Sequence, residues 1–385
     1  MMFEMFDRFR KSPPKQEREE VSPTRKGFDP EVEKQQRAEI QSKVLKRKQR
    51  IESDQDAEHK ANLFAKERGF QDYDAWVADG IKRINFDGLK GVYGDFARRA
   101  GVPVEKMNFI PKEDVAISSA GLSGGAFYDP EANMLSINPR SQRGSFLRLV
   151  EDGVDAKEAS KKTMLQIYFE LTHEYTHATG VNHHSSTTKD DGMITREVII
   201  GYQKSTVMES PNVQGGWRHQ HMLLNEGITT RIGLNAASEY LRRFPLTLET
   251  GETITPADFR AFRTAIDGPA DYALAVYFTD RLVEHIAQQC NVPTEIVWGG
   301  VIQGYYAGHG ISKEMETLFD KIIGKKFSEK LRETPDDDMF SEESGGEYLT
   351  ELAEKYKFPP MSDELKKQVE FLLQNVGDSP FGDLY

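Results

Sequence analysis

The stretch KEASKKTMLQIYFELTHEYTHAT, residues 157–179, decides the fold. Its apolar residues recur three or four positions apart, which places them on one face of an α-helix. They are Met164, Ile167, Tyr168, Leu171, Tyr175 and Ala178. Gly180 follows directly, and glycine commonly ends a helix at its C-terminus. We therefore predict one helix from about residue 157 to 179, anchored in the core by this apolar face.

The opposite face of the same helix carries candidate chemistry. His173 and His177 are four residues apart, so their rings lie one turn apart on one face and can share an ion. Glu174 is rotated by about 100° from His173 and can lie beside the ion without binding it. A zinc ion makes bound water acidic, and a neighbouring carboxylate can take the proton. We predict His173 and His177 as zinc ligands and Glu174 as the general base.

Two residues compete for the place of third ligand. His183 completes the pattern His-Glu-x-x-His-x-x-Gly-x-x-His, and SerThrValMet at 205–208 is a candidate Met-turn for that arrangement. Glu226 lies in HMLLNEGITTRIGL, residues 221–234. Leu224, Ile228 and Ile232 in this stretch recur every four residues, as expected for the inner face of a second helix.

The pattern that ends at His183 resembles the metzincins, which place a substantial sheet before the motif. Here few strand signals precede it, and helical patterns dominate after Glu226. The order of a hairpin, HEYTH, NEGIT and a helical half resembles a class of bacterial gluzincins over about residues 120–331. That resemblance implies a zinc endopeptidase with His173, His177 and Glu226 as ligands. We favour Glu226 and keep the metzincin-type protease with His183 as the alternative.

The same resemblance implies an α+β, predominantly α-helical, zincin-like fold, with a small edge sheet or hairpin above the HExxH helix and a helical C-terminal half. GAFYDPEANMLSINP, residues 125–139, predicts that hairpin, because turn-forming residues separate two short apolar runs. MLSIN, residues 134–138, is a candidate to bind substrate as an added strand, and an ordinary structural hairpin is the alternative.

Other parts of the site are less specified. Some gluzincins have an acid four residues after the zinc-binding glutamate, where this chain has Thr230. We therefore expect another acid, a backbone carbonyl or water to orient a zinc-bound histidine. His219, Tyr272 and His309 are alternative donors to the oxyanion that forms during peptide hydrolysis.

Composition divides the chain into four segments. Residues 1–60 are densely charged and predict a disordered or single-helix segment, followed by a helical region at 61–115. The catalytic domain is predicted at 116–331, with a polar, Gly-rich flap at 181–217. Residues 332–385 hold fourteen acidic and five basic residues and predict an acidic tail with one short helix.

Charge and cysteine content exclude several classes. The net charge of −12 argues against a nucleic-acid or anionic-membrane binder. The resemblance to zinc endopeptidases implies a protein or peptide substrate as the partner. Cys290 is the single cysteine, which rules out an internal disulfide framework. The first residues do not resemble a signal peptide, and we expect a cytoplasmic protein or one exported without a cleaved signal. A catalytically inactive metal-binding interaction protein stays open as an alternative function.

Overall fold

The computed structural model describes residues 55–118, 125–180, 182–188, 193–209, 218–220, 222–265, 270–307, 317–324 and 356–374. The chain forms two compact units, residues 1–56 and 57–385, and nearly all described residues belong to the second. Most of the predicted N-terminal segment therefore lies outside the described residues. The boundaries predicted at 115 and 331 fall inside the second unit and stay predictions.

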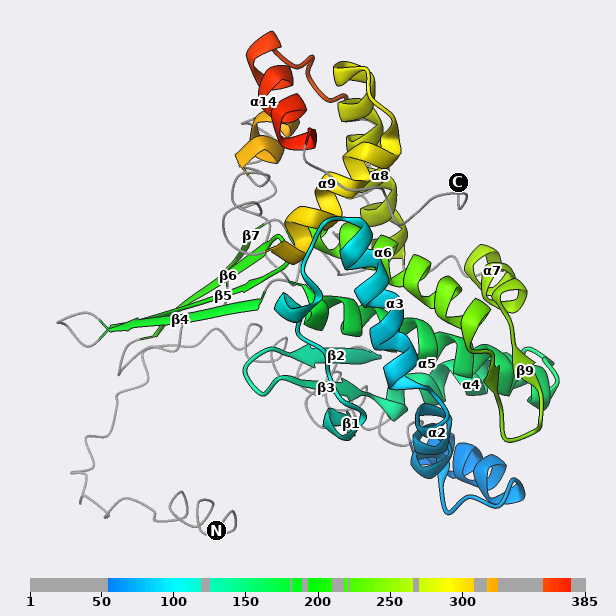
Figure 1. The fold of residues 1–385 in the computed structure, drawn as a ribbon. Coiled ribbons are helices and arrows are strands. Elements are labelled where there is room, and N and C mark those ends of the chain that lie inside the picture. The colour runs from blue at the N-terminus through cyan, green and yellow to red at the C-terminus, as the bar shows by residue number, and fades with distance from the viewer. Residues whose placement is uncertain are drawn as a thin grey trace, which may run out of the picture. The chain divides into compact units, whose positions relative to one another are not determined.

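The described part of the second unit is α+β and mostly helical, as the sequence predicts (Figure 1). Its central element is α5 (Ala156–Thr179), within one residue of the predicted helix. The Asp155 side chain caps its start by accepting a hydrogen bond from the backbone N–H of Lys157 at 2.9 Å. All six residues of the predicted apolar face are buried. The apolar spacing therefore identified the core side of this helix correctly.

Gly180 ends α5 as predicted, but for a different reason. Its φ of −67° and ψ of 176° are extended rather than left-handed, so the backbone does not require glycine. A Cβ atom at this position would lie 2.6 Å from Cε1 of the buried Tyr305 ring. Glycine is needed here to make room for that ring.

Helices pack around α5 on several sides. α6 (Met222–Arg243) lies along it, and Leu224, Ile228 and Ile232 of α6 are buried as predicted. The other helices that complete the core are α2 (Tyr73–Lys82), α3 (Phe86–Arg99), α4 (Pro139–Glu151), α7 (Pro256–Ala265), α8 (Ala270–Cys290) and α9 (Thr294–Ala307). Arg231 of α6 binds Asp280 of α8 through two hydrogen bonds of 3.1 and 2.7 Å, which fixes these two helices against each other.

A three-stranded sheet lies beside α5 with the strand order β1-β3-β2. β2 (Ala126–Asp129) and β3 (Met134–Ile137) form the predicted hairpin, and β1 (Val115–Ile117) pairs with β3 in parallel. In the turn, the Asp129 carboxylate accepts two backbone hydrogen bonds and Asn133 has a φ of 51°. Because β3 is the middle strand, the expectation that 134–138 receives a substrate strand is wrong. The edge strand that contacts α5 is β2.

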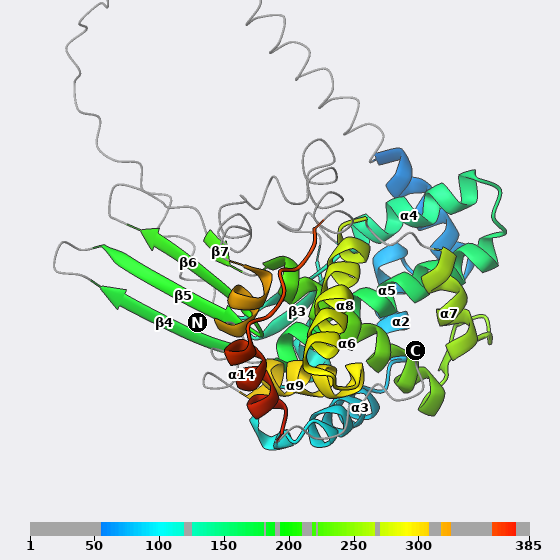
Figure 2. The same cartoon turned by 90° about the horizontal axis from the view of Figure 1, so that it is seen from above.

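The segment between α5 and α6 forms a second sheet rather than an irregular flap. β4 (Asn182–Thr188), β5 (Ile194–Ile200), β6 (Gln203–Glu209) and β7 (Arg218–Gln220) pair antiparallel in that order, and the long strands extend beyond the helices (Figure 2). After Asn182, every residue of β4 is exposed. Since neither face of β4 is buried, its sequence lacks the apolar alternation by which strands are recognised.

The last described segment packs on the helical half. It contains α14 (Asp363–Leu373), which matches the helix predicted in the acidic tail. Leu365, Val369 and Leu373 are buried, and α14 contacts α8 and α9. A short hairpin, β8 (Leu246–Thr247) with β9 (Thr253–Ile254), follows α6. Among the helices of the described residues, none is long and apolar enough to cross a membrane.

Candidate metal centre

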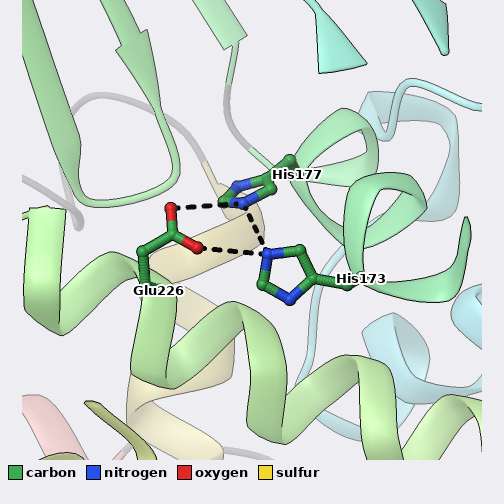
Figure 3. Close-up of side chains that lie close together, drawn as sticks. All are labelled: His173, His177 and Glu226. Carbon is green, nitrogen blue, oxygen red and sulfur yellow. Dashed lines mark hydrogen bonds and ion pairs between the residues drawn. The ribbon is translucent and has the colours of Figure 1, made fainter. Parts of the chain in front are cut away.

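Two helices bring the predicted ligands together. His173 and His177 come from α5 and Glu226 from the second turn of α6, and the three side chains point toward one another (Figure 3). The two Nε2 atoms lie 3.2 Å apart. Glu226 Oε2 is 3.1 Å from Nε2 of His173, and Oε1 is 3.4 Å from Nε2 of His177. All three residues are buried, with 2% to 8% of their surface exposed.

These separations fit one small metal ion. Tetrahedral coordination with bonds of about 2.0–2.1 Å places neighbouring ligand atoms about 3.3 Å apart. The two Nε2 atoms, 3.2 Å apart, match that spacing, and each lies 3.1 or 3.4 Å from a different oxygen of the Glu226 carboxylate. Two imidazoles and one carboxylate suit transition metals rather than calcium or magnesium, which prefer oxygen ligands alone. The group can therefore bind a metal ion, and among the described residues no fourth His, Cys, Asp or Glu belongs to it.

The charges of the three groups depend on one another. Burial alone would raise the pKa of Glu226, but the two imidazoles lower it well below its usual value. Burial would lower the pKa of His177, but the Glu226 carboxylate raises it. The site therefore holds an anion that requires a cation between the rings and the carboxylate, either a proton or a metal ion.

Hydroxyl groups contact the far side of both imidazoles. Thr230 Oγ1 lies 3.2 Å from Nδ1 of His173, and Thr229 Oγ1 lies 3.4 Å from Nδ1 of His177. The sequence led us to expect another acid, a backbone carbonyl or water as the orienting group, and at His173 the hydroxyl of Thr230 itself is in contact. With Nδ1 turned to the threonines, both Nε2 atoms face the metal position.

Glu174 lies next to the three ligands but outside their group. It is only partly buried, and its Oε2 accepts a 2.9 Å hydrogen bond from the backbone N–H of Tyr128 in β2. One turn earlier on α5, Glu170 accepts hydrogen bonds from Gln142 and Gln166. Burial raises the pKa of Glu170 to about 7. The predicted base is therefore held against the edge strand, with a second carboxyl group behind it.

The other candidates lie elsewhere. His183 is exposed in β4, paired by backbone with Ile199, and does not belong to the ligand group. The backbone of His219 forms part of β7, and Tyr272 lies in α8. The side chains of these two residues and all of His309 lie outside the described residues. Within the described ranges, His173, His177 and Glu226 form the single group of three potential ligands.

Three comparisons with known proteins gave no relative. No family model, no curated protein and no solved structure matches this chain.

Proposed function

We propose that this chain is a zinc-dependent endopeptidase of the zincin type, with His173, His177 and Glu226 as zinc ligands and Glu174 as general base. The observation that carries the proposal is the close approach of three buried potential ligands, His173, His177 and Glu226, with the Glu174 carboxylate next to them but outside their group. Structural zinc sites have four protein ligands and favour cysteine, whereas catalytic sites have three and keep one position open. The ligand set and its spacing are of the catalytic kind.

Within this proposal the chain supplies a base, a strand edge and an oriented metal site. A bound zinc ion would lower the pKa of water and polarise the peptide carbonyl. Glu174 has one carboxylate oxygen held by Tyr128 N–H, and the other oxygen is the acceptor for the water proton. The same carboxyl group then carries this proton to the leaving amine.

The edge of β2 is the proposed binding surface for the substrate backbone. Gly125 O accepts a hydrogen bond from Asn138 N at 2.8 Å, toward β3. Strand residues alternate in direction, so the backbone groups of Tyr128 point to the opposite edge, where its N–H meets Glu174. An extended peptide can pair with this edge through main-chain hydrogen bonds, which demand little of its sequence.

The test is the Glu174→Gln variant, with Glu170→Gln as the matched control one turn earlier on α5. Zinc per chain is measured by elemental analysis, and hydrolysis is measured on a fluorescently labelled unfolded protein. We expect Glu174→Gln to keep its zinc and lose hydrolysis by about 10²- to 10⁴-fold, the usual contribution of a general base. The control variant is expected to stay within a few-fold of the wild type.

Two results would contradict the proposal in different ways. A wild type that binds zinc and cleaves no substrate favours the inactive metal-binding protein. Equal hydrolysis by Glu174→Gln and the wild type removes Glu174 from the mechanism.

A further inference from the structure

We infer that Tyr305 is a positioning residue that acts on the metal centre through Thr229. This inference rests on the proposed zinc site and adds to it a residue 79 positions beyond Glu226 in the sequence. Tyr305 lies on α9 and is completely buried. Its hydroxyl group lies 2.9 Å from Thr229 Oγ1 and donates to the backbone carbonyl of Thr176 at 3.3 Å.

The backbone carbonyl of Thr176 determines the direction in which the hydrogen bonds of this series are donated. Thr176 O can only accept, and the Tyr305 hydroxyl donates to it at 3.3 Å beside two closer donors, Gly180 N–H at 3.1 Å and the Thr179 hydroxyl at 3.0 Å. The oxygen of Tyr305 then accepts from the Thr229 hydroxyl. Thr229 has given its single proton and accepts from Nδ1–H of His177, 3.4 Å away. In this arrangement Nδ1 of His177 carries the proton, and the lone pair on Nε2 is directed to the metal position.

The surroundings of Tyr305 hold its ring in one place. A Cβ atom on Gly180 would lie 2.6 Å from one side of the ring, and a Cβ atom on Gly201 would lie 2.4 Å from the other. Gly201 also has a φ of 54°, which disfavours other residues. Two glycines, at the end of α5 and between β5 and β6, thus form a slot for the ring. Burial raises the pKa of Tyr305 well above its usual value, so its hydroxyl keeps the proton that it donates.

One neighbouring group must be considered as a rival partner of His177. Asn225 Nδ2 lies 3.5 Å from Nδ1 of His177. The amide is oriented by Tyr202 N–H, which donates to Asn225 Oδ1 at 2.9 Å. Its Nδ2 can therefore only donate toward His177, and a protonated Nδ1 cannot accept. When Nε2 binds a metal, Nδ1 is protonated and Thr229 is the partner that can accept from it.

The two histidines consequently have separate supports. Thr230 contacts His173, while Thr229 and Tyr305 form a connected pair behind His177. Loss of the Tyr305 hydroxyl should affect His177 and leave His173 unchanged.

The experiment uses the full-length zinc-loaded protein without peptide. Zinc affinity is measured by competition with a chelator, and the Nδ1–H resonances of His173 and His177 are followed by NMR with labelled histidine. The variants are Tyr305→Phe, Thr229→Val, Thr229→Ser and Thr230→Val. Tyr202→Phe is the matched control, because it removes another buried hydroxyl that donates to a carbonyl, Val301 O at 2.9 Å.

We expect Thr229→Val to weaken zinc binding roughly 10-fold or more, within the range for partners of metal ligands, and Thr229→Ser to restore it. Tyr305→Phe should give a smaller loss. Both Tyr305→Phe and Thr229→Val should shift the Nδ1–H resonance of His177 and speed its exchange with water. Thr230→Val should instead change the resonance of His173, and Tyr202→Phe should change neither.

The inference is overturned if Tyr305→Phe and Tyr202→Phe behave alike, or if both histidine resonances change together in Tyr305→Phe. Zinc loading without any peptide hydrolysis would refute the proposed peptidase and leave this inference intact. A wild type that takes up no zinc overturns both.

Discussion

Replacement of Glu226 by alanine gives the sharpest test of the ligand assignment. Glu226 is 8% exposed, and its carboxylate oxygens lie 3.1 and 3.4 Å from the two Nε2 atoms. Alanine at this position therefore leaves no other group in place of the carboxylate. Structural zinc sites with four ligands bind with about 10–16 kcal/mol, which corresponds to about 2.5–4 kcal/mol for each ligand. We therefore expect the zinc dissociation constant of Glu226→Ala to rise about 10²- to 10³-fold.

The assay compares Glu226→Ala with His183→Ala, purified side by side, by chelator competition and by zinc content. His183 is exposed in β4, and its loss should leave zinc binding unchanged. A circular dichroism melt shows whether each variant is folded. If His183→Ala loses zinc and Glu226→Ala keeps it, the metzincin-type alternative is correct and the ligand assignment made here is wrong.

Three further predictions concern stability. The pKa of Glu170 is raised to about 7, so the free energy of unfolding should fall by up to about 3 kcal/mol as the pH rises from about 4.5 to 7. Urea unfolding at pH 5 and pH 8 should show this loss in the wild type and not in Glu170→Gln. The same loss in both proteins would contradict the prediction. Gly180→Ala should lower the free energy of unfolding by about 1–3 kcal/mol, because the new Cβ meets the Tyr305 ring. Gly144→Ala in α4 has open space around it and should raise that free energy by about 0.5–1 kcal/mol. Equal melting temperatures of the two variants would refute this reasoning. Asp155→Ala should cost about 1 kcal/mol in thermal unfolding, since it removes the N-cap of α5, and an unchanged melting temperature would show that this cap contributes nothing.

The sequence predicted the helices of the site because their buried faces are periodic. α5 and α6 each bury one apolar stripe, and the histidines and Glu226 follow from their positions on those helices. The hairpin β2–β3 was predicted from its turn residues. The parallel pairing of β1 with β3 was not predicted, since it joins segments that no local pattern connects.

The groups behind the histidines were missed for a different reason. Nothing in the spacing of Thr229 and Tyr305 distinguishes them from ordinary core positions, and Thr230 stood out only by its place four residues after Glu226, not as a group that contacts His173. The sequence did contain one indirect signal. The ring of Tyr305 leaves no room for a Cβ atom at Gly180 or Gly201, which explains both glycines, but these contacts are visible only in three dimensions.

The hydrogen bond from Tyr128 N–H to Glu174 has a consequence for the order of events in the proposed reaction. That N–H belongs to the edge to which a peptide strand would add, so the base and the incoming backbone carbonyl compete for one donor. A peptide carbonyl that accepts from Tyr128 N–H takes this donor away from Glu174, so both carboxylate oxygens become available to accept a proton. Because a hydrogen bond to a carboxylate favours its charged form, substrate pairing at this edge would make Glu174 a stronger base.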